Sequence, residues 1–78
     1  MGGERGYDAV MRLSARNRLV GKITDIKMGD VMAHVVVQVG ENVIDSVITR
    51  QSAEDMHLKV GDTVAAVIKS TEVMLEKA

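Results

Sequence analysis

The sequence predicts an all-β fold of five short strands and one short helix, and three observations lead to this prediction. Valine and isoleucine recur at every second position over several short segments, which is the period of a half-buried strand. Clusters of glycine, aspartate and asparagine separate these segments, and such residues are typical of turns. A single short stretch beginning at Ser52 carries the signals of a helix.

The first two strands are expected over residues 19–28 and 31–39. In the first, the apolar positions change phase between Ile23 and Ile26, as a β-bulge or a bend requires. In the second, His34 lies on one face together with Gln38. The opposite face of that strand carries five apolar residues, namely Val31, Ala33, Val35, Val37 and Val39.

Residues 43–49 and 63–68 supply the third and fourth strands, and residues 73–75 supply a short fifth one. The third and fourth strands are apolar on both of their faces. A small barrel buries only the inward face of each strand, so the second face is expected to contact another subunit.

The helix is expected between the third and fourth strands. Ser52 is predicted to cap its N-terminus, with the acidic Asp55 three positions further on. A turn at residues 59–62 limits this helix to two turns. Five short strands and one helix in this order favour a small OB-like β-barrel, and an SH3-like barrel is the alternative that patterning leaves open.

Length and composition limit how much core the chain can build. Residues 11–78 are expected to form a single domain, and residues 1–10, which lack periodicity, a flexible N-terminal leader. The chain has 78 residues, one tyrosine, no phenylalanine, no tryptophan and no cysteine. At this size a single core is marginal, and no disulfide or thiolate metal site can reinforce it. Self-association is therefore the expected source of additional stability.

The charge distribution argues against binding to nucleic acid. The net charge is −1 overall, with +3 over residues 1–22 (five basic against two acidic) and −4 over the rest (five against nine). An OB-type module that binds nucleic acid would stack bases on aromatic side chains, and the only one here is Tyr7 in the leader. No apolar run reaches about 18 residues and no signal peptide is evident, so a cytoplasmic protein without membrane contact is expected.

Two short segments combine a cation with small hydroxyl donors. They are Ser14-Ala15-Arg16-Asn17, just before the first strand, and Lys69-Ser70-Thr71, near the end of the chain. Arginine and lysine supply charge, while hydroxyls and backbone N–H groups donate short hydrogen bonds. Such a set suits a small oxyanion, and it indicates binding rather than bond breaking.

No set of residues in the sequence supports catalysis. Ser14 has no identifiable base, and the sequence contains no nucleophile elbow, phosphate loop or metalloprotease helix. His34 and His57 are not accompanied by carboxylates at the spacing of metal ligands. We therefore expect neither an enzyme nor a side-chain metal site.

The order of several motifs resembles the molbindin (Mop) family, whose TOBE/Mop domains are small molybdate-binding modules. The opening Met11-x-Leu13-Ser14-Ala15-Arg16-Asn17-x-Leu19-x-Gly21-Lys22-Ile23 carries the resemblance first. The rest follows in order as Val39-Gly40, Ile48-Thr49-x-x-Ser52, Leu58-x-Val60-Gly61-Asp62, Ala66-Val67-Ile68-Lys69 and Glu72-Val73-Met74-Leu75. Together these motifs cover residues 11–76, nearly the whole chain outside the leader.

This resemblance implies an OB-like barrel that assembles as a trimer of dimers and holds molybdate or tungstate between subunits, with no organic cofactor. Carried over by position, the ligands would be Ser14 and Arg16 with the amides near Ala15 and Asn17. A neighbouring subunit would complete the site with Thr49, Ser52, Lys69 and Ser70. The family often has alanine and then a hydroxyl residue after the lysine, whereas here Ser70 and Thr71 are both hydroxylated, so either one could contact the anion.

The function expected on this basis is oxyanion binding for intracellular storage and homeostasis. A regulatory module that senses the same anion and acts on a transporter or a transcription partner is the alternative. A nucleic-acid-binding OB module is a further alternative, which the composition disfavours.

Overall fold

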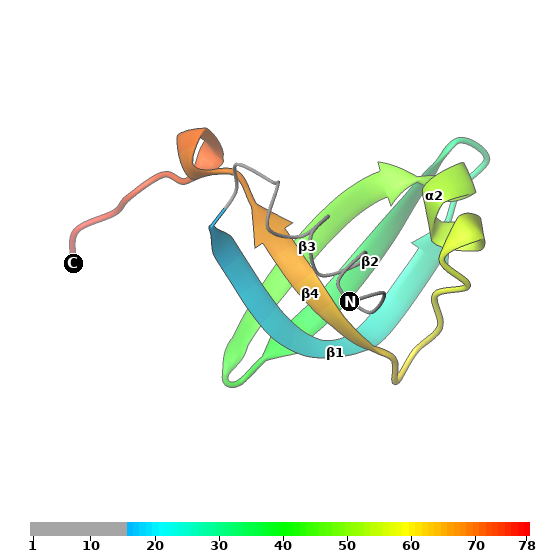
Figure 1. Ribbon diagram of the computed structural model, residues 1–78, viewed down its shortest axis with the longest axis horizontal. Coiled ribbons are helices and arrows are strands. Elements are labelled where there is room, and N and C mark those ends of the chain that lie inside the picture. The colour runs from blue at the N-terminus through cyan, green and yellow to red at the C-terminus, as the bar shows by residue number, and fades with distance from the viewer. Residues whose placement is uncertain (1–15) are drawn as a thin grey trace, which may run out of the picture. The chain divides into compact units, whose positions relative to one another are not determined.

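The computed structural model describes residues 16–78, and the leader, Ser14 and Ala15 lie outside the described residues. Its elements follow in the order β1 (Asn17–Met28), β2 (Met32–Val39), β3 (Asn42–Thr49), α2 (Arg50–Asp55), β4 (Thr63–Ile68) and the 3₁₀ turn η1 (Ser70–Glu72), as Figure 1 shows. The chain divides into two compact units. One is Leu19–Ala66, and the other combines Met1–Arg18 with Val67–Ala78 and is called the unit of the chain ends. Within this second unit, the structure describes residues 16–18 and 67–78.

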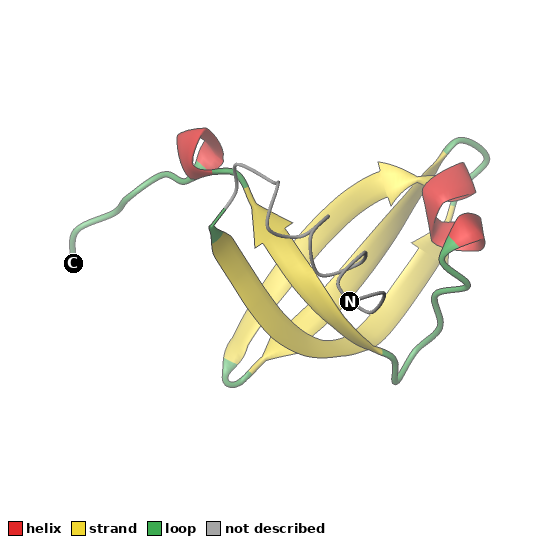
Figure 2. Cartoon of the chain, in the orientation of Figure 1, coloured by secondary structure: helices red, strands yellow, loops and turns green. Residues whose placement is uncertain are grey.

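The unit Leu19–Ala66 is built on a sheet whose strand order is β3-β2-β1-β4 (Figure 2). The pairs β1–β2 and β2–β3 are antiparallel and joined by short turns. The register between β1 and β2 shifts between Ile23 and Asp25. This β-bulge confirms the change of phase that the sequence predicts, because the extra residue moves Ile26 back to the face that Ile23 occupies.

The core lies on one face of this sheet. Ile23, Val35 and Val37 are buried there. Partly buried apolar side chains pack against this cluster, namely Ile26, Val39, Ile44, Ile48, Leu58 and Val64. The alternation predicted for the second strand is thus confirmed from Ala33 to Val39, but it is wrong for Val31.

Val31 is 71% exposed and precedes β2, because it belongs to the turn between β1 and β2. Its carbonyl accepts a hydrogen bond from the Arg50 amide (2.8 Å), and the Gly29 amide donates to the carbonyl of Met32 (2.7 Å). A residue in a turn does not follow the alternation of the strand beside it, so the apolar pattern alone placed Val31 on the wrong face.

The N-cap of helix α2 lies three residues before Ser52, the position expected from the sequence. Thr49, the last residue of β3, is the N-cap, with extended backbone (φ −70°, ψ 148°) and a hydroxyl that accepts from the Ser52 amide at 3.1 Å. The predicted Ser52 cap is therefore wrong, since Ser52 is the third residue inside the helix. Because the strand runs directly into the helix, its final residue is the one placed to cap it.

The helix ends within two turns, as the sequence predicts. His57 has a positive φ of 54°, its amide donates to the Glu54 carbonyl (3.0 Å), and the Leu58 amide donates to the Ala53 carbonyl (3.2 Å). This pair of bonds is a Schellman motif with histidine in the left-handed position that glycine usually takes. It directs the chain away from α2 and toward the turn before β4.

The expected fifth strand is not formed in this chain, and the structure describes four strands. Val73 has extended backbone (φ −100°, ψ 118°), but residues 73–78 carry no strand. Met74 and Leu75 are 94% and 93% exposed. An extended segment becomes a strand only when a neighbouring strand accepts its hydrogen bonds, and among residues 16–78 these residues have no such neighbour.

Residues 59–62 form a tight turn directly before β4, and this turn is hydrogen-bonded to β1. The Asp62 amide donates to the Lys59 carbonyl (3.1 Å), and Gly61 has a φ of +96°. Ile23 then pairs with two residues, because the Gly61 amide donates to its carbonyl (2.8 Å) and its own amide donates to the Asp62 carbonyl (2.9 Å). This arrangement is a β-bulge of the type that requires glycine at its first position.

The Asp62 side chain holds the same turn together. Its carboxylate accepts from the Lys59 ammonium at 2.9 Å and from the Lys59 amide at 3.0 Å. These hydrogen bonds, with the side-chain one contributing most, lower the pKa of Asp62 below its ordinary value of 3.8. The carboxylate therefore favours the folded turn above about that pH, and this contribution is lost as the pH falls through the lowered pKa.

We predict that Gly61→Ala lowers the free energy of unfolding by about 1–2 kcal/mol. A Cβ at Gly61 meets no atom within 4 Å, so the cost comes from the positive φ and not from a clash. Urea unfolding at one fixed protein concentration measures it. Val60→Ala, in the same turn, trims an exposed side chain and should change stability by less than about 0.5 kcal/mol. Equal stability of Gly61→Ala and wild type would show that the turn tolerates another conformation.

Candidate functional site

The donors predicted from the sequence lie in both compact units. Five of them belong to the unit of the chain ends, namely Arg16, Asn17, Lys69, Ser70 and Thr71. Thr49 and Ser52 belong to the unit Leu19–Ala66. Each unit contains a local arrangement of donors that can be described by itself.

In the unit of the chain ends, a side-chain hydrogen bond links Asn17, in the first predicted segment, to the residue that precedes Lys69. The side-chain amide of Asn17, the first residue of β1, donates from Nδ2 to the carbonyl oxygen of Ile68 at 3.2 Å, across 51 positions of sequence. Ile68 is the last residue of β4. Arg16 precedes one partner of this bond and Lys69 follows the other, so the structure brings the two segments together.

The segment after Ile68 turns sharply. Lys69 has extended backbone (φ −69°, ψ 135°) and caps the 3₁₀ turn η1, in which the Glu72 amide donates to the Lys69 carbonyl at 2.8 Å. The first two N–H groups of such a turn, those of Ser70 and Thr71, have no acceptor inside it. Two backbone donors and two hydroxyls therefore follow Lys69 directly.

The charges beside these donors are not neutralised by the described chain. Arg16 and Lys69 are exposed, and neither forms an ion pair within residues 16–78. A guanidinium and an ammonium that have no acidic partner among residues 16–78, next to hydroxyl and amide donors, favour an anion with several acceptor oxygens.

In the other unit, Thr49 and Ser52 form a short chain of hydroxyl groups. The Thr49 hydroxyl accepts from the Ser52 amide and donates to the Ser52 hydroxyl oxygen at 2.8 Å. Because Ser52 Oγ accepts from Thr49, its own proton is free to donate to a further acceptor. Both residues are exposed, so this acceptor can be a ligand oxygen.

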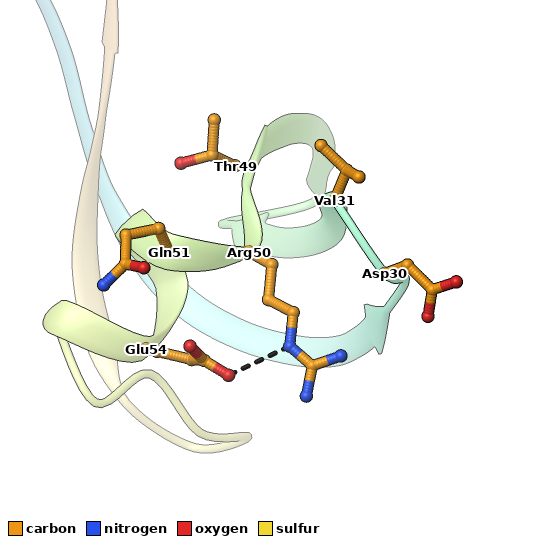
Figure 3. Close-up of a pocket in the computed structure, with 6 residues that line it drawn as sticks. All are labelled: Asp30, Val31, Thr49, Arg50, Gln51 and Glu54. Atoms are coloured by element: carbon orange, nitrogen blue, oxygen red, sulfur yellow. Dashed lines mark hydrogen bonds and ion pairs between the residues drawn. The ribbon is translucent and has the colours of Figure 1, made fainter.

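A hollow of about 470 Å³ opens beside Thr49 (Figure 3). Its lining consists of Asp30, Val31, Thr49, Arg50, Gln51 and Glu54. In Figure 3 the Arg50 side chain extends toward Glu54, and its Nε donates to Glu54 Oε2 at 2.9 Å. Arg50 also donates to the carbonyl of Gly29 at 3.2 Å. With its arginine engaged and two carboxylates in its wall, this hollow does not suit a dianion.

Of the residues that line this hollow, the sequence singled out Thr49 as a candidate ligand, but not Arg50 or Glu54. The i,i+4 spacing of Arg50 and Glu54 was the signal for their ion pair, but only once α2 is known to begin at Arg50. The expected start at Ser52 concealed it.

Two further features of the described residues bear on the class of protein. Within residues 16–78 no three His, Asp or Glu side chains are grouped to hold a metal ion. None of the helices described there has the length and apolar character needed to cross a membrane.

Comparison with known proteins identifies the class. The TOBE domain family matches residues 13–75, so the chain belongs to this family of small domains. Molybdenum-pterin-binding protein 1 of Clostridium pasteurianum is 46% identical over 66 residues, which cover 83% of this chain and 97% of the relative. The resemblance to molbindins is thereby confirmed.

Solved structures agree with this assignment. A molybdate-binding protein from Sporomusa ovata has a TM-score of 0.82 at 36% identity, covering 86% of this chain and all of the other. ModG, a cytoplasmic molybdate-binding protein solved with molybdate bound, has a TM-score of 0.71 at 38% identity, covering 76% of this chain and 43% of ModG. The predicted OB-like fold class is confirmed by these neighbours.

We predict that Thr49→Ala lowers the free energy of unfolding of the oxyanion-free protein by about 1 kcal/mol, because the Ser52 amide loses its acceptor. Thr49→Ser keeps the hydroxyl and should retain most of that stability. Denaturant unfolding of both variants at one protein concentration measures the difference. If Thr49→Ser were destabilised as much as Thr49→Ala, the cost would come from the lost methyl group and not from the cap.

Proposed function

We propose that this protein binds molybdate, or its analogue tungstate, and stores it in the cytoplasm. The observation that carries this proposal is the Asn17–Ile68 hydrogen bond, which joins the segment of Arg16 to the segment of Lys69, Ser70 and Thr71. The names of its relatives support the ligand, since the Sporomusa ovata protein and ModG are molybdate-binding proteins. ModG is also the support for a cytoplasmic location.

The chemistry of these donors matches that of the anion. Molybdate at neutral pH is a tetrahedral dianion whose four oxygens only accept hydrogen bonds. Removing it from water is costly unless donors surround it. Hydrogen bonds to a charged group contribute about 1.5–3 kcal/mol each, so several together offset this cost. Arg16 can supply two parallel donors, and Lys69 supplies a compact charge.

The donors described in residues 16–78 are exposed, and we propose that the site is shared between subunits. Ser14, Ala15, Arg16 and Asn17, with Lys69, Ser70 and Thr71, form one set of ligands, and Thr49 and Ser52 form the other. Ser52 is exposed, and its hydroxyl can donate a hydrogen bond to an oxygen of an anion that a neighbouring copy holds. A hexamer built as a trimer of dimers is the assembly we propose.

Exposed apolar side chains support assembly. Val43 and Val47 on β3 are 55% and 64% exposed, as the double-sided strand pattern predicts, and Met74 and Leu75 are almost fully exposed. Large exposed apolar side chains in each unit are suited to contact with another protein.

The free oxyanion, and not a pterin complex of molybdenum, is the proposed ligand. Proteins hold flat heterocycles by stacking them on aromatic rings. The chain has no phenylalanine or tryptophan, and its one tyrosine, Tyr7, lies outside the described residues. Residues 16–78 fit a small tetrahedral anion and contain no phenylalanine, tyrosine or tryptophan ring. Catalysis is not part of this proposal.

We predict that the protein binds molybdate in calorimetric titration and that Arg16→Ala or Lys69→Ala weakens the affinity by about 10- to 150-fold, the equivalent of one charged hydrogen bond. Lys27→Ala is the matched control, because Lys27 is an exposed cation of β1 without an ion pair among the described residues. Unchanged affinity in both site variants would contradict the proposed ligands. Absence of binding by the wild type would contradict the function itself.

We predict that the wild type sediments as a hexamer at micromolar concentration and that the double variant Met74→Ser/Leu75→Ser forms smaller species. Burying a Leu or Met side chain contributes about 1.5–3 kcal/mol, and a serine forfeits most of it. Lys77→Ser changes a nearby charged residue and should keep the assembly. A wild type that sediments as a monomer would exclude a shared site.

A further inference from the structure

We infer that the side chain of Asn17 is a positioning residue for oxyanion binding, which holds the segments of Arg16 and Lys69 together and does not itself contact the anion. This inference rests on the proposed function and deepens it. Its basis is the hydrogen bond from Asn17 Nδ2 to the carbonyl oxygen of Ile68 at 3.2 Å.

The position of this bond explains why it would matter for binding. Its donor is adjacent in sequence to Arg16 and its acceptor is adjacent to Lys69, while 51 positions separate the two bonded residues. Arg16 and Lys69 carry like charges that no acidic side chain of residues 16–78 neutralises. Without an anion, their repulsion favours separation of the two segments. The hydrogen bond of the Asn17 side chain adds to the pairing of β1 with β4 and opposes that separation, so the anion meets donors that are already assembled.

Asparagine is suited to this task. It provides an N–H donor on a short side chain, and it adds no charge to a site for a dianion. Aspartate has the same shape but cannot donate to the Ile68 carbonyl, and it would place a negative charge beside the ligand. The backbone amide of Asn17 remains available as a ligand in its own right, since only the side chain makes this bond.

A second side-chain amide of the protein makes a bond of the same kind and provides the matched control. Gln38 Nε2 donates to the carbonyl of Gly40 at 2.8 Å, in the turn between β2 and β3. Both bonds are exposed and link a side-chain amide to a backbone carbonyl. Gln38→Ala therefore removes the same interaction from a part of the chain that holds no proposed ligand.

The test measures molybdate affinity by calorimetry, well below the melting temperature, for the wild type, Asn17→Ala, Asn17→Asp and Gln38→Ala. We expect Asn17→Ala to weaken binding by about 3- to 10-fold, the equivalent of one neutral hydrogen bond, and Asn17→Asp to weaken it further. Gln38→Ala should bind as the wild type does. Wild-type affinity in Asn17→Ala would overturn the inference, and an equal loss in Gln38→Ala would reduce it to a general effect of stability.

A double-mutant cycle separates positioning from direct contact. If Asn17 acts by keeping Lys69 in place, then Asn17→Ala should cost less than about 2-fold in a Lys69→Ala background. The full loss in that background would show that Asn17 does not act through Lys69, and the inference would be wrong.

Amide hydrogen exchange tests the positioning role of Asn17 without requiring that the protein binds molybdate. In the anion-free protein, Asn17→Ala should speed exchange of the Glu72 amide, which donates to the Lys69 carbonyl, whereas Gln38→Ala should leave it unchanged. If the wild type bound no molybdate, the proposed function would fail, and exchange would still report whether Asn17 orders this segment. If Asn17→Ala changed neither the exchange rate nor the molybdate affinity, the positioning role of Asn17 would be rejected, and the proposed function would stand.

Discussion

The packing of Ile23 against Val35 and Val37 is the interaction on which the rest of this protein depends. These side chains are buried on one face of the sheet, and the aliphatic residues around them are only partly covered. The bulge in β1 keeps Ile26 on the same face, and the Gly61–Asp62 bulge fixes β4 to β1 at Ile23 itself. Since no Phe or Trp enlarges this core, the fold has little stability in reserve, and its uncovered apolar strands favour association with further copies.

Much of this architecture is predictable from the sequence because it depends on local pattern. The alternation of β2, the change of phase in β1 and the limits of β4 follow from side-chain periodicity, which is a property of neighbouring residues. The helix cap is a different case. Thr49 and Ser52 are both residue types that favour the N-cap position, and which of them caps the helix depends on where β3 ends. The position of Val31 depends in the same way on a turn held by the Arg50 amide.

The candidate site shows a similar division. Arg16 and Lys69 can be identified from the sequence because a cation beside hydroxyl residues is a local signal, and the order of family motifs reinforces it. The hydrogen bond from Asn17 to Ile68, the residue before Lys69, spans 51 positions of sequence. A local sequence pattern does not predict such a contact. The fifth strand could not be judged from the sequence either, because pairing depends on a partner strand that residues 16–78 do not supply.

The exposure of Met74 and Leu75 has a consequence for the lifetime of the protein. These two residues follow Val73, whose backbone is extended, and they are almost fully exposed to solvent. Exposed segments whose backbone makes no hydrogen bonds are preferred sites of proteolytic cleavage. If the chain assembles as proposed, a copy without neighbours would be degraded faster than an assembled one.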